Sequence, residues 1–154
     1  MNTAMLNTAK AWPAAALDQP VLAALILRLA LGAMWISHCL LKLIVFTPAG
    51  TSAFFESVGL PGWITWPAMM AEFIGGLMII AGWHGRIASA ALLPILLGAA
   101  WIHWPNGWVF TAKNGGWEYP VFLAAVSFVH ALLGDGPWSV GGGRPGNQYD
   151  SRSA

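Results

Sequence analysis

The sequence predicts an all-α membrane protein, an antiparallel bundle of four transmembrane helices. Composition is the first indication, because 57% of the 154 residues are hydrophobic and only 8% are charged, whereas a typical soluble domain has about 25% charged residues. The second indication is that four long apolar stretches follow one another, separated by turn residues. One such bundle accounts for the length and leaves no room for a second domain.

The first helix is predicted over residues 21–46, after the helix-start signal at residues 18–20. At about 1.5 Å per residue it would be about 39 Å long, enough to cross about 30 Å of hydrocarbon. At about 100° per residue, one broad face of this helix carries Arg28, Trp35, His38, Cys39 and Lys42. Polar groups in a spanning helix point toward other helices or a wet cavity, so we expect this face to lie inside the bundle.

The other spans follow from apolar runs and turn signals. They are expected at residues 63–83 (or from Pro67 onward), at residues 86–104 with a kink at Pro94, and from residues 117–120 to the turn at 134–137. Residues 47–62 and 105–116 are expected to be loops. In this interpretation residues 1–19 form an N-terminal arm, residues 20–139 the membrane domain, and residues 140–154 a flexible tail.

Tryptophans and basic residues predict the orientation. Tryptophans gather at both ends of the spans, as in the aromatic belts of membrane proteins, with Trp63, Trp66, Trp101, Trp104, Trp108 and Trp117 at one end and Trp83 and Trp138 at the other. The two long loops hold only Lys113, whereas the opposite side carries Lys10, Arg86, Arg144 and Arg152. The positive-inside rule therefore predicts that both termini lie in the cytoplasm. A net charge of +1 gives no reason to expect nucleic acid, and a single cysteine excludes an internal disulfide.

Ionisable side chains from all four spans gather at the end that carries the long loops, namely His38, Lys42, Glu72, His103 and Glu118. Most have an ordinary explanation as well: Lys42 can extend to the interface, His103 can belong to the aromatic belt, and Glu118 suits a helix start. Glu72 is different, because it lies near the middle of its span, where a charge costs about 2.5–3.5 kcal/mol. We expect it to have a function or an essential partner, either His38 or Lys42. Arg28 and His130 lie deeper and could equally be paired structurally or form a second site.

This cluster could in principle serve a metal ion, a haem or a quinone. A metal site formed by His38, His103 and Glu72 lacks a supporting motif, and so does a haem held by His38 and His103, and we expect neither. A quinone site needs an apolar slot, aromatic walls and a few groups that handle protons. His38, Lys42 and Glu72 are the candidate catalytic residues. The candidate binding residues are His38, Glu72, His103, Glu118, Trp35 and Trp101. Composition alone does not single out a quinone.

An ordered set of motifs resembles a known family. The motifs are His38-x-x-x-Lys42-Leu43, Glu72-x-x-Gly75-Gly76, Gly82-Trp83-His84-Gly85-Arg86, His103, Gly116-Trp117-Glu118-Tyr119-Pro120 and Gly134-Asp135-Gly136-Pro137-Trp138-Ser139. In this order, over roughly residues 20–140, the chain resembles the DoxX family of small four-helix bacterial membrane proteins. It departs from the family pattern at Val140-Gly141, where Leu-Asp is more usual.

The resemblance implies a redox-associated membrane subunit. The related DoxD subunit belongs to a thiosulfate:quinone oxidoreductase, and other relatives are linked to oxidative-stress or thiol-redox assemblies. The leading hypothesis is a quinone-interacting subunit in which His38 and Glu72 exchange protons with the quinone and Lys42 stabilises negative charge. The alternative hypothesis is a non-catalytic accessory or assembly subunit of a larger complex. A third hypothesis is a small proton-coupled carrier. We expect the lipid bilayer, protein partners in a membrane complex, or further copies of the chain as partners.

Overall fold

The computed structural model describes residues 19–136 and 138–141. Along the chain the elements are α1 (Gln19–Leu40), a π-helical turn (Leu41–Val45), α2 (Pro48–Ser57), a 3₁₀ turn (Gly62–Ile64), α3 (Thr65–Ala81), α4 (Gly85–His103), a 3₁₀ turn (Trp104–Asn106) and α5 (Glu118–Leu133). The expected N-terminal arm, except Gln19, lies outside the described residues. Most of the expected tail, from residue 142 onward, does so too.

The helices have the length and apolar character of membrane spans. Within the described residues, three helical stretches are long and apolar enough to cross a bilayer, namely Gln19–Val45, Gly62–Ala81 and Gly85–Asn106, and α5 is a shorter apolar helix. The 16 residues of α5 correspond to about 24 Å. The predicted all-α, four-helix membrane bundle is therefore confirmed.

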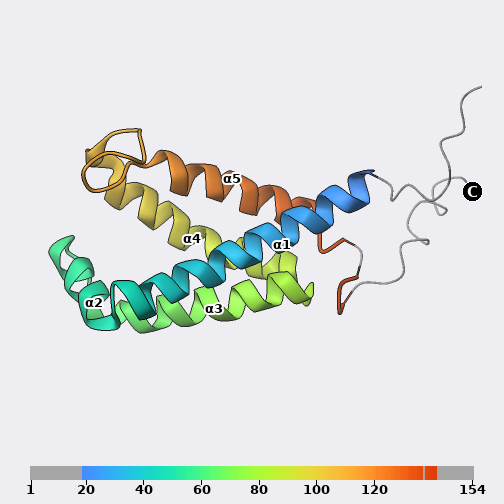
Figure 1. Cartoon of the computed structure of the whole chain (residues 1–154), viewed down its shortest axis with the longest axis horizontal. Coiled ribbons are helices and arrows are strands. Elements are labelled where there is room, and N and C mark those ends of the chain that lie inside the picture. Colours follow the sequence, from blue (N-terminus) through green and yellow to red (C-terminus); the bar gives the residue numbers. More distant parts are fainter. Residues whose placement is uncertain (1–18, 137, 142–154) are drawn as a thin grey trace, which may run out of the picture.

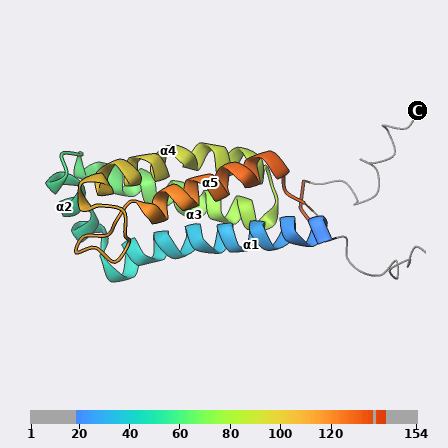
Figure 2. The ribbon, with the colours of Figure 1, turned by 90° about the horizontal axis from the view of Figure 1, so that it is seen from above.

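The four spans form two pairs, α1 with α3 and α4 with α5, whose members lie side by side (Figure 1). The pairs meet at the end where α3 turns into α4, which we call the closed end. They separate toward the end that carries α2 and residues 104–117, which we call the open end (Figures 1 and 2). The candidate site lies between the two helix pairs at the open end.

Glycines bring α1 and α3 into direct contact. A Cβ atom added at Gly32 in α1 would lie 2.9 Å from the carbonyl oxygen of Gly76 in α3, and one at Gly76 would lie 3.0 Å from the carbonyl oxygen of Gly32. Gly75 on the same helix faces α4, where an added Cβ would lie 2.6 Å from Leu92 Cδ1. Small residues at these positions let the helix backbones approach closely, which packing in membranes requires.

A short segment, residues 134–136 and 138–141, ties the closed end together. The buried Arg28 of α1 donates to the carbonyl oxygen of Asp135 and, at 3.2 Å, to that of Trp138. The Asp135 carboxylate accepts from the Gly85 amide at the start of α4 (3.2 Å), and the Val140 amide donates to the last residue of α3, Ala81 (2.9 Å). Arg28 thus has a structural partner at this end.

His130 belongs to the same end of the bundle. It is fully buried and shares a hydrogen bond with Ser89 of α4, with 2.7 Å between Nδ1 and Oγ. Arg28 and His130 therefore bond to different partners. The His130–Ser89 bond joins α5 to α4 within one pair, whereas the Arg28 bonds join α1 to the segment after α5 and so hold the two pairs together at this end.

The structure corrects the expectation that residues 47–62 are a loop. Residues 48–57 form α2, whose first amides are capped by the Thr47 side chain, which accepts from the Gly50 amide at 3.2 Å. Pro48 suits the first helical position, because the amide hydrogen it lacks would have no partner there. Thr47-Pro48 thus ends the first helix, as expected, and also begins another.

Candidate functional site

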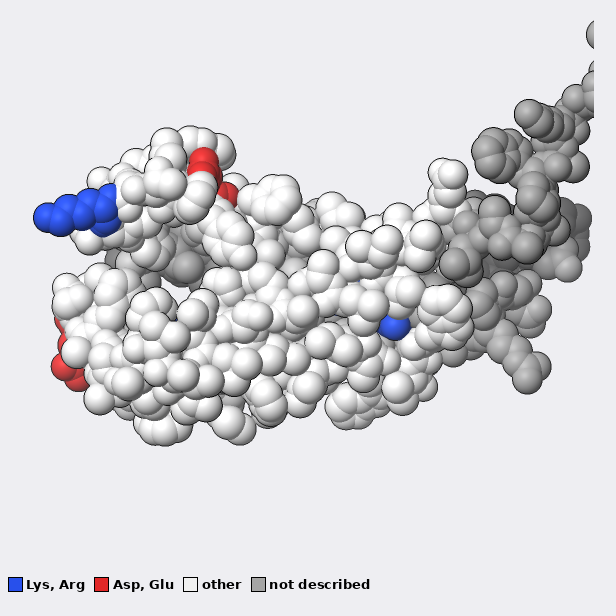
Figure 3. Space-filling model, viewed as in Figure 1, with Lys and Arg blue, Asp and Glu red and all other residues white. Residues whose placement is uncertain are grey.

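A cavity of about 790 Å³ occupies the open end between the two helix pairs. Figure 3 shows the surface hollowed at this end of the molecule. The lining is mostly apolar and comes from all five α-helices; its side chains with polar or ionisable groups include His38, Lys42, Thr51, Glu72, His103 and Tyr119. Small-molecule sites typically have about 300–1,000 Å³ and a few polar groups on apolar walls, so the cavity is suited to an amphiphilic ligand.

Lys42 and Glu72 form an ion pair at the cavity wall. The Lys42 ammonium lies 2.7 Å from one Glu72 carboxylate oxygen and 2.9 Å from the other. The Glu72 side chain is only 3% exposed and that of Lys42 is 19% exposed. Glu72 therefore has the partner expected for a charge at this depth, and that partner is Lys42 rather than His38.

Lys42 lies in the π-helical turn that follows α1. A π turn inserts one extra residue into the helical repeat, and such turns occur frequently at functional sites. Here the turn coincides with the position where the helix supplies its ammonium group to α3. The Lys42 side chain is thus engaged inside the protein and does not extend freely to the membrane interface.

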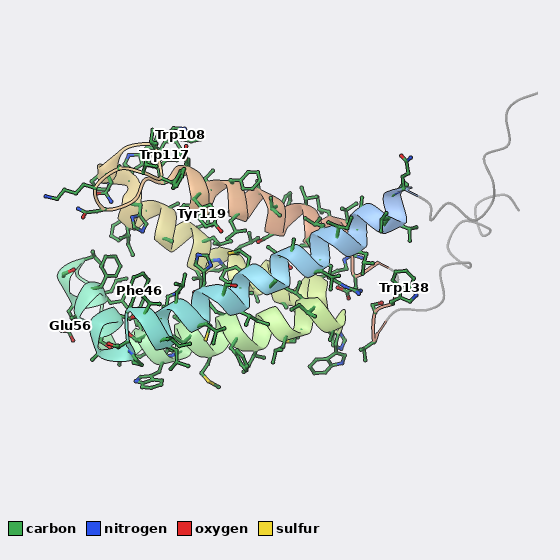
Figure 4. All side chains as sticks on the ribbon, viewed as in Figure 1. Phe46, Glu56, Trp108, Trp117, Tyr119 and Trp138 are labelled. Atoms are coloured by element: carbon green, nitrogen blue, oxygen red, sulfur yellow. The ribbon has the colours of Figure 1, made fainter. Side chains whose placement is uncertain are left out.

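His38 connects the two helix pairs across the cavity. Its Nδ1 lies 3.0 Å from the carbonyl oxygen of Met34, one turn earlier in α1. Its ring stacks on Tyr119, with 5.9 Å between centroids and 14° between planes. Tyr119 extends from the start of α5 toward α1 (Figure 4). On the α4 side His103 completes the polar part of the wall, and its Nδ1 lies 3.3 Å from Asn106 Nδ2.

The DoxX family model matches residues 23–104. This chain belongs to the DoxX family. The match spans α1 to α4. It therefore includes both members of the Lys42–Glu72 ion pair, and it also includes His38 and His103. No curated protein and no solved structure matches the chain significantly.

Five of the predicted site residues of this DoxX protein lie at the cavity, namely Trp35, His38, Lys42, Glu72 and His103. Trp35 is almost completely buried, and its indole N–H has no hydrogen-bond partner among the described residues. The indole nitrogen is itself buried, so Trp35 contributes apolar ring surface to the cavity wall and not an exposed donor.

The other two predicted residues, Glu118 and Trp101, do not line the cavity. Glu118 Oε1 accepts a hydrogen bond from the Phe110 amide at 3.0 Å and so holds the segment after α4. Trp101 is 69% exposed and borders a separate crevice beside Trp104. Both residues belong to the open end, but their side chains point elsewhere.

Two polar residues of the DoxX cavity were not anticipated. Tyr119 follows Glu118 within a quoted motif, and its four-residue spacing to Leu123 and Ser127 is a helical periodicity that could have indicated an inward face. Thr51 gave no comparable signal, because it lies on α2, where a loop was expected. Among the described residues no group of three or more His, Cys, Asp or Glu side chains could hold a metal ion, and Cys39 is free and buried.

Proposed function

We propose that this DoxX protein is a membrane redox subunit that binds a quinone in the cavity and exchanges protons with it. The observation that carries the proposal is a buried ion pair, Lys42–Glu72, which lies with His38 at the wall of a largely apolar cavity. An apolar wall suits a ligand that partitions into the bilayer, and the few polar side chains on that wall suit a ligand with polar atoms. When bound, a quinone supplies two-electron redox chemistry.

Each polar residue has a distinct role in this proposal. Two of the three N–H groups of Lys42 reach Glu72, so the third can donate to a ligand oxygen and stabilise the negative charge that develops there. Reduction of a quinone to the quinol would consume two electrons, supplied by the partner protein, and two protons. His38, from Nε2, would deliver one proton to a ring oxygen and Glu72 the other, and both residues would take their protons back in the reverse direction.

The electrons come from a protein partner in this proposal, because the sequence has no flavin, haem or iron–sulfur motif. Orientation is part of the same proposal. In the sequence, Lys10 precedes α1, Arg86 follows the turn between α3 and α4, and Arg144 and Arg152 follow α5. These positions support a bacterial inner-membrane protein with cytoplasmic termini and a cavity near the outer surface. A quinone would reach the cavity at the open end.

The experiment measures quinone reduction by membranes that contain the intact protein with its native partners. Glu72→Gln and His38→Ala should abolish the quinone reduction that depends on this protein, measured per molecule of folded protein, while the helix content of the folded protein stays unchanged. His84→Asn is the matched control, because His84 is an exposed imidazole at the closed end. Normal quinone reduction in both cavity variants would refute the proposal.

A second function, an accessory subunit without redox chemistry, is favoured by one observation. The Lys42–Glu72 pair joins α1 to α3 and would stabilise the bundle even without a ligand. Glu72→Gln should then reduce the yield of the complex while the remaining complex keeps its full redox rate. Complex yield and rate per complex, measured on the same membranes, separate the two functions.

A further inference from the structure

The hydrogen-bond partners of the two cavity histidines fix opposite tautomers. For His38 the partner is the Met34 carbonyl oxygen at 3.0 Å, which can only accept, so Nδ1 carries the hydrogen. In the neutral imidazole the second nitrogen, Nε2, is then a hydrogen-bond acceptor. The α1 wall of the cavity therefore carries an imidazole acceptor.

For His103 the partner is the side-chain amide of Asn106. The nitrogen of that amide also donates to the carbonyl oxygens of Gly115 (2.9 Å) and Asn114 (3.2 Å), and these oxygens can only accept. They require the NH₂ group, not the amide oxygen, at the position 3.3 Å from His103 Nδ1. The amide nitrogen has two hydrogens for these three neighbours and cannot itself accept, so a hydrogen on His103 Nδ1 would face it without a partner. Nδ1 therefore carries no hydrogen and shares one from the amide, and the neutral ring of His103 carries its hydrogen on Nε2.

Donors for a ligand are consequently available on both helix pairs. Lys42 on the α1–α3 pair has one N–H left after its two bonds to Glu72. His103 on the α4–α5 pair has its Nε2–H, and both side chains line the same cavity. A ligand that uses both needs an acceptor oxygen on each of two opposite sides.

We infer that the ligand bridges the two helix pairs as a 1,4-dicarbonyl ring, with one carbonyl oxygen on Lys42 and the other on the Nε2–H of His103, which Asn106 orients as a donor. This inference rests on the proposed quinone function and adds a specificity residue to it. It assigns His103 the role of binding the second carbonyl.

The experiment compares two ligands on the full-length protein in lipid nanodiscs. One is a 1,4-benzoquinone with a ten-carbon tail, and the other is an aryl ketone with the same tail and a single carbonyl. In the wild type the quinone should bind more tightly, because the ketone can use only Lys42. His103→Leu should weaken quinone binding about fivefold, as expected for one lost hydrogen bond, and leave ketone binding unchanged.

Two controls separate this role from a general disturbance. His103→Gln places an amide N–H at a similar reach and should keep most of the preference for the quinone, and His84→Asn should bind both ligands as the wild type does. As a second measurement, the nitrogen NMR spectrum of the His103 ring should show Nε2 protonated and Nδ1 unprotonated at neutral pH. Asn106→Leu, which removes the amide partner, should mix the two tautomers.

The outcomes are distinguishable. If the wild type binds neither ligand, the proposed quinone function fails and this inference fails with it. If the wild type binds the quinone and His103→Leu keeps the full preference over the ketone, only the bridging inference is overturned. A protonated Nδ1 in His103 would overturn it as well, since the donor would then point at Asn106.

Discussion

Removing either member of the Lys42–Glu72 pair should destabilise the bundle, and removing both should restore much of the loss. Loss of one partner of a buried ion pair leaves an uncompensated charge, at a cost of about 3–5 kcal/mol. The two residues differ in exposure, 3% for the Glu72 side chain and 19% for that of Lys42. Lys42→Met leaves the more buried charge unpaired and should therefore cost about 4 kcal/mol, whereas Glu72→Gln should cost nearer 3 kcal/mol.

The double variant Lys42→Met/Glu72→Met leaves no charge and keeps most of the packing volume. Its free energy of unfolding should lie within about 1 kcal/mol of the wild type, because apolar replacements of buried pairs are often neutral or stabilising. The assay is equilibrium unfolding in mixed micelles of mild and denaturing detergent, followed by tryptophan fluorescence. Single variants within about 0.5 kcal/mol of the wild type, or additive effects in the double variant, would refute the reasoning.

Three other predictions concern the scaffold. Gly76→Leu should separate α1 from α3 and cost about 1–3 kcal/mol in the same unfolding assay, whereas Gly98→Ala, whose added Cβ meets nothing within 4 Å, should be neutral. Arg28→Ala removes the bonds to the segment after α5, so limited proteolysis should cleave that segment faster than in the wild type; equal rates would contradict its bridging role. Thr47→Ala should lose about 0.5–2 kcal/mol of capping energy and speed amide exchange at Gly50, whereas Thr47→Asn keeps a capping side chain and should exchange as slowly as the wild type.

The spans could be predicted because each is governed by local rules of length and hydropathy. The first helix ends where expected, before Thr47, and α5 begins at Glu118 within the expected window. The helix α2 could not be separated from a loop by the same rules. A helix of ten residues is too short to span a membrane, so hydropathy and length did not indicate it. The pair Thr-Pro also marks the end of one helix as readily as the start of the next.

The sequence predicted how deep in the membrane the site residues lie, but not which neighbouring helix each side chain faces. Residue spacing placed Lys42 and Glu72 toward the same end of the bundle, and the cost of a charge near the middle of a span required a partner for Glu72. Height along a helix does not say which neighbour a side chain faces, which is why Glu118 and Trp101 were grouped with the cavity. In the structure Glu118 binds the loop after α4. Near Glu118, the rings of Trp108 and Trp117 pack edge to face with 4.4 Å between their centroids (Figure 4). Residue spacing along the chain does not predict such a tertiary contact.

The unequal length of the spans gives this protein an uneven hydrophobic thickness around its perimeter. The continuous helix from Gln19 to Val45 has 27 residues and α5 has 16, about 40 Å against about 24 Å. Hydrocarbon of about 30 Å is too thin for the first, which must tilt, and too thick for the second, beside which the bilayer must thin. Lipids along α5 are therefore compressed relative to those along α1, and this mismatch favours contact between α5 and other short helices in the same membrane.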